Sequence, residues 1–260
     1  HFLSSFRPKN LISFWLILFF IIFPCRRGQS QTGVLIPSTK PSPDASILSL
    51  QTMNVDICID NQTATVRVVQ IFDNKTGQNL EGKFLFALPD RASVADFAVW
   101  EGDARIPGVM MERRRANEVY GEIKQKFVDP GILQQTDENG NSAFSAKVFP
   151  ITPYGTKRIE MEYTENLAIE NLSSGFTFPL KPNWGETQKV GEFNLTVCAY
   201  NEYPISNFEY NPEKFPLEIS KQTENEFEAE FHARDYELTD DFAFRYRLDV
   251  PESRFSFIAY

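Results

Sequence analysis

Apolar and polar side chains alternate with a period of two residues along much of the chain after residue 50. Ile159, Met161 and Tyr163 alternate with charged neighbours, and the same period recurs over residues 242–248. Such alternation gives a strand one apolar face and one polar face. Residues 66–71, 84–88 and 94–100 are apolar enough to form further, well-buried strands. The pattern predicts an all-β fold in the form of a β-sandwich.

Turn residues separate these segments. Asn139-Gly140 lies between two strand-like runs, residues 132–136 and 143–149. Asn-Gly favours the left-handed backbone of a type I′ turn. The two runs are therefore predicted to pair as a hairpin.

Residues 112–127 break the two-residue period. Their apolar positions recur every three or four residues, at Ala116, Val119, Tyr120, Ile123 and Phe127. This spacing lines one face of an α-helix, and Asp129-Pro130-Gly131 ends it. We predict one α-helix, inserted between strands.

Residues 169–260 contain further strand-like segments. They show no repeat of fixed length. This region could form a second sandwich, or its strands could complete the sheet predicted for residues 50–168. The sequence pattern leaves both arrangements open.

The first 30 residues have the composition of an export signal. Arg7 and Lys9 precede an apolar run over residues 11–23, and Gly28-Gln29-Ser30 offers small residues for cleavage. The run is shorter than the roughly 20 residues that span a bilayer. We predict a signal peptide over residues 1–30 and a secreted or cell-envelope protein, attached to a membrane only if the signal stays uncleaved.

Residues 31–49 are rich in Pro, Ser and Thr. This composition is typical of linkers, and we predict a linker between the signal peptide and the first domain.

Two cysteines, Cys58 and Cys198, follow the predicted signal peptide. In an oxidising compartment they could form a disulfide. Each cysteine lies on the same face of its predicted strand as the polar residues two positions away. The pattern therefore does not place either cysteine in the core. The sequence leaves a disulfide and two free thiols equally open.

The charge balance argues against a nucleic-acid-binding protein. The chain has 35 acidic and 26 basic residues, which gives a formal net charge of −9 at pH 7. No basic stripe interrupts this acidic composition. An acidic domain repels the phosphate backbone, so we expect no nucleic-acid partner.

The sequence also lacks the usual marks of catalysis. His232 is the one histidine after the N-terminal segment, and it belongs to no Cys or His group with the spacing of zinc ligands. Glycine motifs for dinucleotides or phosphates and the nucleophile-elbow motif do not occur. We therefore predict a protein that is not an enzyme and that uses no cofactor or metal.

Several motifs, in order, resemble the VIT (vault protein inter-alpha-trypsin) domain family over residues 50–168. An aromatic strand ends in a Leu-Pro turn, a short hairpin follows, and the predicted helix carries the family's Ala and Tyr. The closing segment resembles its V-x-P-I-x-P-x-G pattern. The matching segments are FLFALP (84–89) with ASV (92–94), Gly102, Ile106 and Gly108, ANEVY (116–120), PGIL (130–133) with NSAF (141–144), VFPI (148–151), PYG (153–155) and residues 159–163.

The resemblance implies a protein–protein interaction or scaffold module in an exported protein, with a protein partner that it does not identify. In this family a von Willebrand factor A domain usually follows, so residues 169–260 would precede such an adhesion-type domain. Its metal motif, D-x-S-x-S, does not occur in this sequence, and no metal ligand is carried over. We predict a contact surface on the helix, at Arg113, Arg114 and Asn117, and on the loop at Tyr154.

Two other functions fit the sequence. A carbohydrate-binding β-sandwich could use Trp100 and Trp184 as platforms on which sugars stack. A hydrolase with an acidic pair would need two carboxyl groups about 5–10 Å apart in a cleft, and the many acidic residues mark no such pair.

Overall fold

The computed structural model of the protein describes residues 31–89, 91–111, 132–138, 141–182 and 188–250. Within these ranges the regular secondary structure is β-strand throughout, which confirms the all-β prediction. The helix predicted for residues 112–127 lies outside the described residues. Among the described residues, no helix has the length and apolar character needed to cross a membrane.

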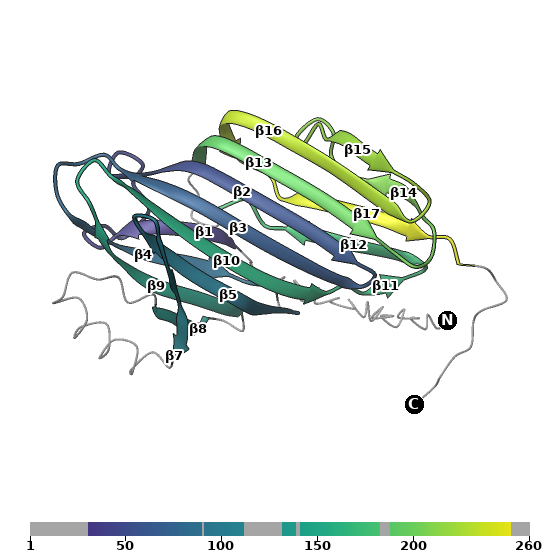
Figure 1. Cartoon of the computed structure of the whole chain (residues 1–260), viewed down its shortest axis with the longest axis horizontal. Helices are drawn as coiled ribbons and strands as arrows, with labels where there is room; N and C mark the ends of the chain where they lie inside the picture. Colours follow the sequence, from purple (N-terminus) through teal and green to yellow (C-terminus); the bar gives the residue numbers. More distant parts are fainter. Residues whose placement is uncertain (1–30, 90, 112–131, 139–140, 183–187, 251–260) are drawn as a thin grey trace, which may run out of the picture.

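One large sheet organises the molecule (Figure 1). It has eight strands in the spatial order β15 (Glu218–Gln222), β16 (Glu226–Leu238), β13 (Gln188–Tyr200), β2 (Leu48–Asp60), β3 (Thr63–Asn74), β10 (Thr156–Asn166), β5 (Ala92–Glu101) and β6 (Ala104–Pro107). All neighbours in this sheet are antiparallel except β13 and β2, which are parallel.

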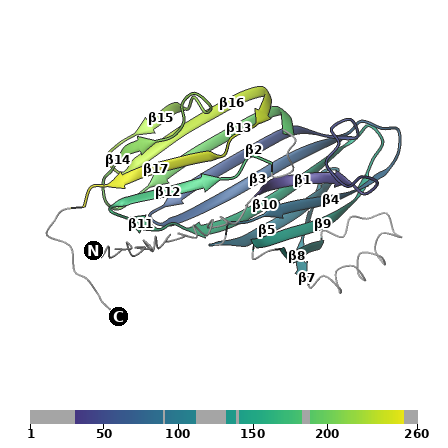
Figure 2. The same cartoon turned by 180° about the vertical axis from the view of Figure 1, so that it is seen from behind.

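Two smaller sheets cover one face of the large sheet, as Figure 2 shows from behind. The five-stranded sheet has the order β1 (Gln31–Pro37), β4 (Leu80–Ala87), β9 (Asn141–Ile151), β8 (Ile132–Glu138) and β7 (Val109–Met111). The four-stranded sheet has the order β11 (Ile169–Glu170), β12 (Ser173–Phe178), β17 (Phe242–Leu248) and β14 (Ile205–Glu209). The opposite face of the large sheet is called the outer face below.

The two layers are held together by aromatic side chains that point inward at every second position. Phe84 of β4 packs edge-on against Phe72 of β3, with ring centroids 6.5 Å apart. Phe208 of β14 stacks on Phe227 of β16 at 4.5 Å. The alternation predicted for residues 84–88, 159–163 and 242–248 is present, and its inward members are buried. These contacts form a two-layer, sandwich-like arrangement with one apolar core.

The strands after residue 168 complete the sheet of the first region. β13 lies directly beside β2, with Val190 opposite Leu50 and Tyr200 opposite Asp60. β16 and β15 extend the same sheet beyond β13. Of the two arrangements that the sequence left open, the structure has the one in which the later strands continue the first sheet, and a four-stranded sheet from the same region covers them.

The predicted linker needs correction, because residues 31–37 form strand β1. This strand pairs with β4, and its Val34, Leu35 and Ile36 are buried. The side chain of Gln70 donates a hydrogen bond of 2.8 Å to the carbonyl oxygen of Gly33. These three apolar residues lie between a glycine and a proline. A run of three is too short to show the two-residue period of a strand, so the sequence pattern did not predict β1. Beyond β1, β2 starts at Leu48, so the irregular connection is shorter than predicted.

The predicted hairpin is confirmed. β8 pairs with β9 in antiparallel register, from Leu133 opposite Ala146 to Glu138 opposite Asn141. The turn residues 139 and 140 lie outside the described residues.

Candidate interaction surfaces

Three loops meet at one end of the molecule, which we call the tip: residues 38–47, 75–79 and 152–155. Asn74, the last residue of β3, connects the second and third of these loops. Its side-chain nitrogen donates to the carbonyl oxygens of Gln78, Ile151 and Thr152 at 2.7, 3.1 and 2.9 Å. Its side-chain oxygen accepts from the backbone N–H and the hydroxyl of Thr76. The first loop joins through the Lys75 N–H, which donates to the carbonyl of Ile47. The buried side chain of Asn74 thus holds the loops of the tip together through several hydrogen bonds.

Tyr154 is the exposed aromatic residue of this tip, as the sequence analysis predicted for the loop. Its relative exposure is 78%. Its backbone has φ of 53°, a left-handed conformation that costs an ordinary side chain free energy. A hydrogen bond from the Tyr154 N–H to the carbonyl of Thr76, 3.0 Å long, helps to hold it there. Its ring lies beside Gly77, where an added Cβ would come within 3.2 Å of the hydroxyl oxygen.

A second feature, which we call the arginine cluster, lies on the outer face. Glu160 accepts a 2.9 Å hydrogen bond from Nε of Arg105, another from Arg158, and lies 3.6 Å from a guanidinium nitrogen of Arg67. The glutamate side chain is 4% exposed, whereas the arginines are 36–49% exposed. Three guanidinium groups carry more N–H donors than one carboxylate can accept, and Arg105 uses one of them in an ion pair with a second carboxylate, that of Asp96.

Trp100 belongs to the same part of the outer face. The guanidinium carbon of Arg158 lies 4.4 Å from the centre of its ring, a cation–π contact. The ring is half-buried, and one of its faces is occupied by this contact. That geometry does not favour Trp100 as a sugar platform. Trp184, the other predicted platform, lies outside the described residues.

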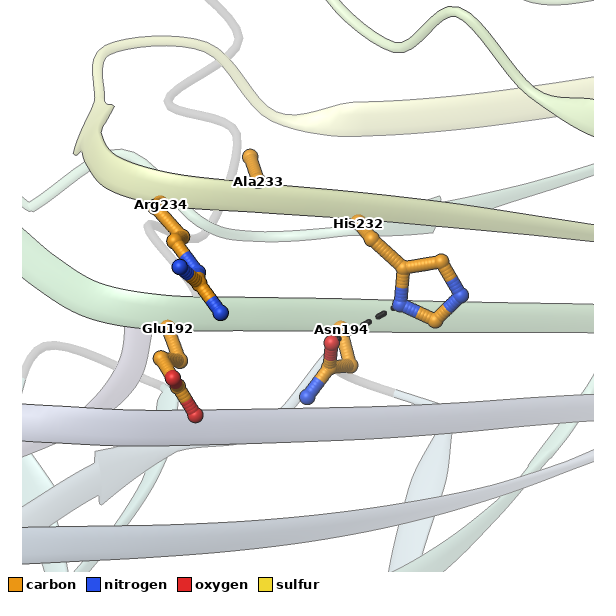
Figure 3. A pocket seen from close by; sticks show the side chains of 5 residues that line it. All are labelled: Glu192, Asn194, His232, Ala233 and Arg234. Atoms are coloured by element: carbon orange, nitrogen blue, oxygen red, sulfur yellow. Dashed lines mark hydrogen bonds between the residues drawn. The ribbon is translucent and has the colours of Figure 1, made fainter.

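A shallow depression of about 350 Å³ lies between β13 and β16 (Figure 3). The His232 ring nitrogen Nδ1 is 2.8 Å from the side-chain oxygen of Asn194, and the amide nitrogen of Asn194 donates to Asn54 at 2.7 Å. Asn194 therefore accepts at its oxygen, and Nδ1 of His232 is the donor. The lining residues are Glu192, Asn194, His232, Ala233 and Arg234.

His232 and Glu192 are the side chains in the lining of the depression that could take part in acid–base chemistry. Nε2 of His232 lies 3.3 Å from a carboxylate oxygen of Glu230, so both ring nitrogens face side-chain oxygens. Glu192 is the one carboxylate in its lining, where an acidic pair would need two. Among the described residues there is no group of three or more His, Cys, Asp or Glu side chains that could hold a metal.

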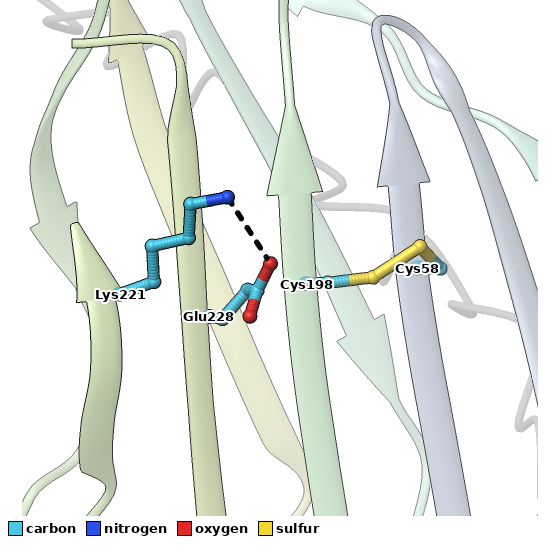
Figure 4. Close-up of a disulfide and its surroundings, with 4 residues drawn as sticks. All are labelled: Cys58, Cys198, Lys221 and Glu228. Carbon is cyan, nitrogen blue, oxygen red and sulfur yellow. Dashed lines mark ion pairs between the residues drawn. A yellow bond between two sulfur atoms is a disulfide. The ribbon is translucent and has the colours of Figure 1, made fainter. Parts of the chain in front are cut away.

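The structure joins Cys58 of β2 and Cys198 of β13 in a disulfide (Figure 4). The two residues are in register on neighbouring parallel strands, with Cα atoms 4.7 Å apart. Cys58 is exposed and Cys198 is half-buried. The bridge lies on the outer face and links the first region of the chain to the later strands across 140 residues.

The sequence predicted the exposed position of Tyr154 but did not predict the arginine cluster. Tyr154 is exposed at the tip, as expected, whereas Arg113, Arg114 and Asn117 lie outside the described residues. The arginine cluster was not anticipated, because its members come from three separate strands. Outward-facing arginines on predicted strands were visible, but without the register their meeting at Glu160 could not be derived.

Comparison with known proteins identifies the first region. Residues 50–163 match the family described as the vault protein inter-alpha-trypsin domain, VIT. Human protein mono-ADP-ribosyltransferase PARP4 is 25% identical over 138 residues, which cover 52% of this chain and 8% of that protein. The mouse protein of the same name is 23% identical over 149 residues, 57% of this chain and 7% of that protein. The chain thus matches less than a tenth of these curated relatives.

A solved structure from Legionella pneumophila, described as a candidate nutrient binding protein, shares the fold. Its TM-score is 0.53 at 14% identity, and the match covers 84% of this chain and 72% of that one. At this identity the likeness concerns the fold alone. The family match over residues 50–163 agrees with the ordered motifs within it, and it identifies this region of the chain as a VIT domain.

Proposed function

We propose that this chain is a protein–protein interaction module that acts by surface complementarity, without bond chemistry. The observation that carries the proposal is Tyr154, an aromatic side chain 78% exposed on a tip that is fixed by the hydrogen bonds of Asn74. Tyrosine is enriched among residues that dominate binding energy. A preformed conformation lowers the entropy lost on binding. Strained backbone in a well-supported loop is also typical of functional positions.

The proposal includes the predicted helix over residues 112–127, inserted into the β-sandwich, with Arg113, Arg114 and Asn117 as part of the contact surface. It also includes a downstream von Willebrand factor A domain, which this module would present. The transferase activity in the name of PARP4 belongs to a much longer protein and is not part of the proposal.

We further propose that the protein is exported, secreted or held in the cell envelope, and that a membrane is involved only through an uncleaved N-terminal signal. The composition of residues 1–30 supports this. The Cys58–Cys198 disulfide supports it independently, because disulfides persist in oxidising compartments.

A photo-crosslinking experiment tests the contact surface. The full chain carries p-benzoylphenylalanine in place of Tyr154 and, as a matched control, in place of Glu170, an exposed residue of β11 at the other end of the molecule. Irradiation in the source cells is expected to yield a discrete crosslinked protein from position 154 and none from position 170. Equal products from both positions, or none from 154, would refute the role of the tip.

Reading the coding sequence beyond residue 260 tests the domain arrangement separately. A D-x-S-x-S motif shortly downstream is the expected result. A stop codon directly after residue 260 would remove the adhesion-type domain from the proposal and leave the contact surface unaffected.

A further inference from the structure

The Cys58–Cys198 disulfide is open to solvent on the outer face of the large sheet. Cys58 is exposed, so its sulfur can be reached from solution without unfolding. Figure 4 shows Glu228 of β16 beside Cys198, and the two residues are opposite each other in the β13–β16 register. A reactant that approaches the bridge therefore meets the carboxylates of the neighbouring strands.

Carboxylates surround the bridge on both sides. On β16, Glu230 and Glu226 lie opposite Thr196 and Tyr200, the positions two residues before and after Cys198. On β2, Asp56 and Asp60 flank Cys58 in the same way and lie on the same face. With Glu228 they make a group of five acidic side chains, which we call the acidic frame: Asp56, Asp60, Glu226, Glu228 and Glu230.

Cationic side chains only partly balance the acidic frame. Nζ of Lys221 lies 2.7 Å from Glu226 and 3.7 Å from Glu228. Arg67 is opposite Asp56 in the register, but its ion pair is with Glu160. His232 lies beside Glu230 and counts as a cation only when protonated. The field at the disulfide is therefore negative.

We propose that Cys58–Cys198 is a thiol–disulfide exchange site that reacts faster with neutral and cationic thiols than with anionic ones. In the first step a thiolate attacks the Cys58 sulfur, a mixed disulfide forms, the bond between the two cysteines breaks, and Cys198 leaves as a thiolate. In the second step another thiolate attacks the mixed disulfide, which releases the oxidised small disulfide and the Cys58 thiolate. Two thiols supply the two electrons, and both cysteine thiolates then take protons from water.

The acidic frame opposes this reaction twice for an anionic reductant. It repels the approaching thiolate, and Glu228 destabilises the negative charge that develops on Cys198 beside it. The repulsion depends on the charges that the reductant carries apart from its thiolate. The effect of Glu228 on the Cys198 thiolate is the same for every reductant. At a separation of about 7 Å in water, one unit charge changes a rate about threefold, so several carboxylates together give a selectivity of about tenfold.

The natural reductant that fits this site is a dithiol on a neutral or basic protein surface. Glutathione, which carries a net negative charge, fits poorly. Glutathione would then reduce the bridge about tenfold more slowly than a cationic thiol does, and a protein of this kind would open it faster when it docks. This inference does not depend on the proposed contact surface at Tyr154.

The test measures how fast cysteamine, 2-mercaptoethanol and glutathione reduce the disulfide in the folded full chain at low ionic strength. Each rate is divided by the rate of the same thiol with the uncharged hydroxyethyl disulfide, which removes differences in nucleophilicity. The expected order is cysteamine, then mercaptoethanol, then glutathione, with about tenfold between the extremes. The spread is expected to shrink in 1 M salt, where the Debye length is about 3 Å.

Two variants with the same change in net charge complete the test. Glu228→Gln is expected to raise the rate at which glutathione reduces the disulfide about threefold. Glu192→Gln removes a carboxylate on the same strand face, six residues from Cys198 and so about 20 Å away, and is expected to change nothing. Equal normalised rates for the three thiols would overturn the inference. So would equal effects of the two variants, or a reduction rate equal to the rate of global unfolding.

Discussion

Glu160 lies on the outer face of the large sheet, where a strand residue normally meets water, yet three arginines bury it. Burial acts to raise the pKa of this carboxyl group. Hydrogen bonds from Arg105 and Arg158 and the charge of Arg67 outweigh burial, so its pKa is lowered from the ordinary glutamate value. The ionised form therefore stabilises the folded state at neutral pH. That contribution is lost as the pH falls through the lowered pKa of the folded protein.

Glu160→Gln is therefore expected to lower the free energy of unfolding by about 2 kcal/mol at neutral pH, the scale of a hydrogen bond to a charged group. The difference in free energy of unfolding between wild type and variant should become smaller as the pH falls below the ordinary pKa of a glutamate carboxyl group. Urea unfolding at a series of pH values measures this gap. Glu170→Gln, at an exposed position, is the control and should follow the wild type. A gap that stayed constant with pH would contradict the assigned pKa.

At the scale of elements, β1 holds the edge of the five-stranded sheet through a close approach at Gly33. A Cβ added there would lie 2.2 Å from the ring of Phe84 and 2.5 Å from the side-chain oxygen of Gln70. Phe84 is buried in the core and cannot move aside cheaply. The strand thus depends on a glycine for its distance from the sheet beneath it.

Gly33→Ala is expected to cost about 1–3 kcal/mol, the usual penalty for overpacking. Gly175→Ala in β12 is the matched control, because the nearest atom to its added Cβ is 3.5 Å away. The denaturant midpoints of both variants and of the wild type give the comparison. If the two variants were equally stable, the close packing of β1 on Phe84 would be wrong.

Local patterns predicted those elements whose own side chains carry a period. β17 alternates over its whole length and β10 does so in its sequence over residues 158–163, and the β8–β9 pair follows from the turn residues between them. β1 was missed because its three apolar residues are too few to show a period. Likewise, exposure of Tyr154 could be expected from a Pro-Tyr-Gly loop, whereas the arginine cluster required the register of β3, β10 and β5–β6.

At the scale of the whole molecule, the parallel pairing of β2 with β13 decides how the chain is organised. No local pattern reveals it, because the paired strands are far apart in the sequence and each would suit another neighbour. The pairing joins the region matched by the VIT family, residues 50–163, to strands that lie beyond that match. The family boundary in the sequence is therefore not a boundary in the sheet.

The folding unit is accordingly larger than the matched domain, and a truncation series tests this. A fragment of residues 50–163 would lose β13 from the edge of β2, leaving residues 50–60 of that strand unpaired on that side. It would also lose β1 and the four-stranded sheet, which together cover much of the apolar face. Bare edges of this length promote aggregation. We expect the fragment to aggregate or to lack a cooperative thermal transition, whereas residues 31–250 give a monomer that unfolds in one transition. Size-exclusion chromatography and circular dichroism distinguish these outcomes, and a monomeric, cooperatively folded 50–163 fragment would show that the later strands are an addition to an independent domain.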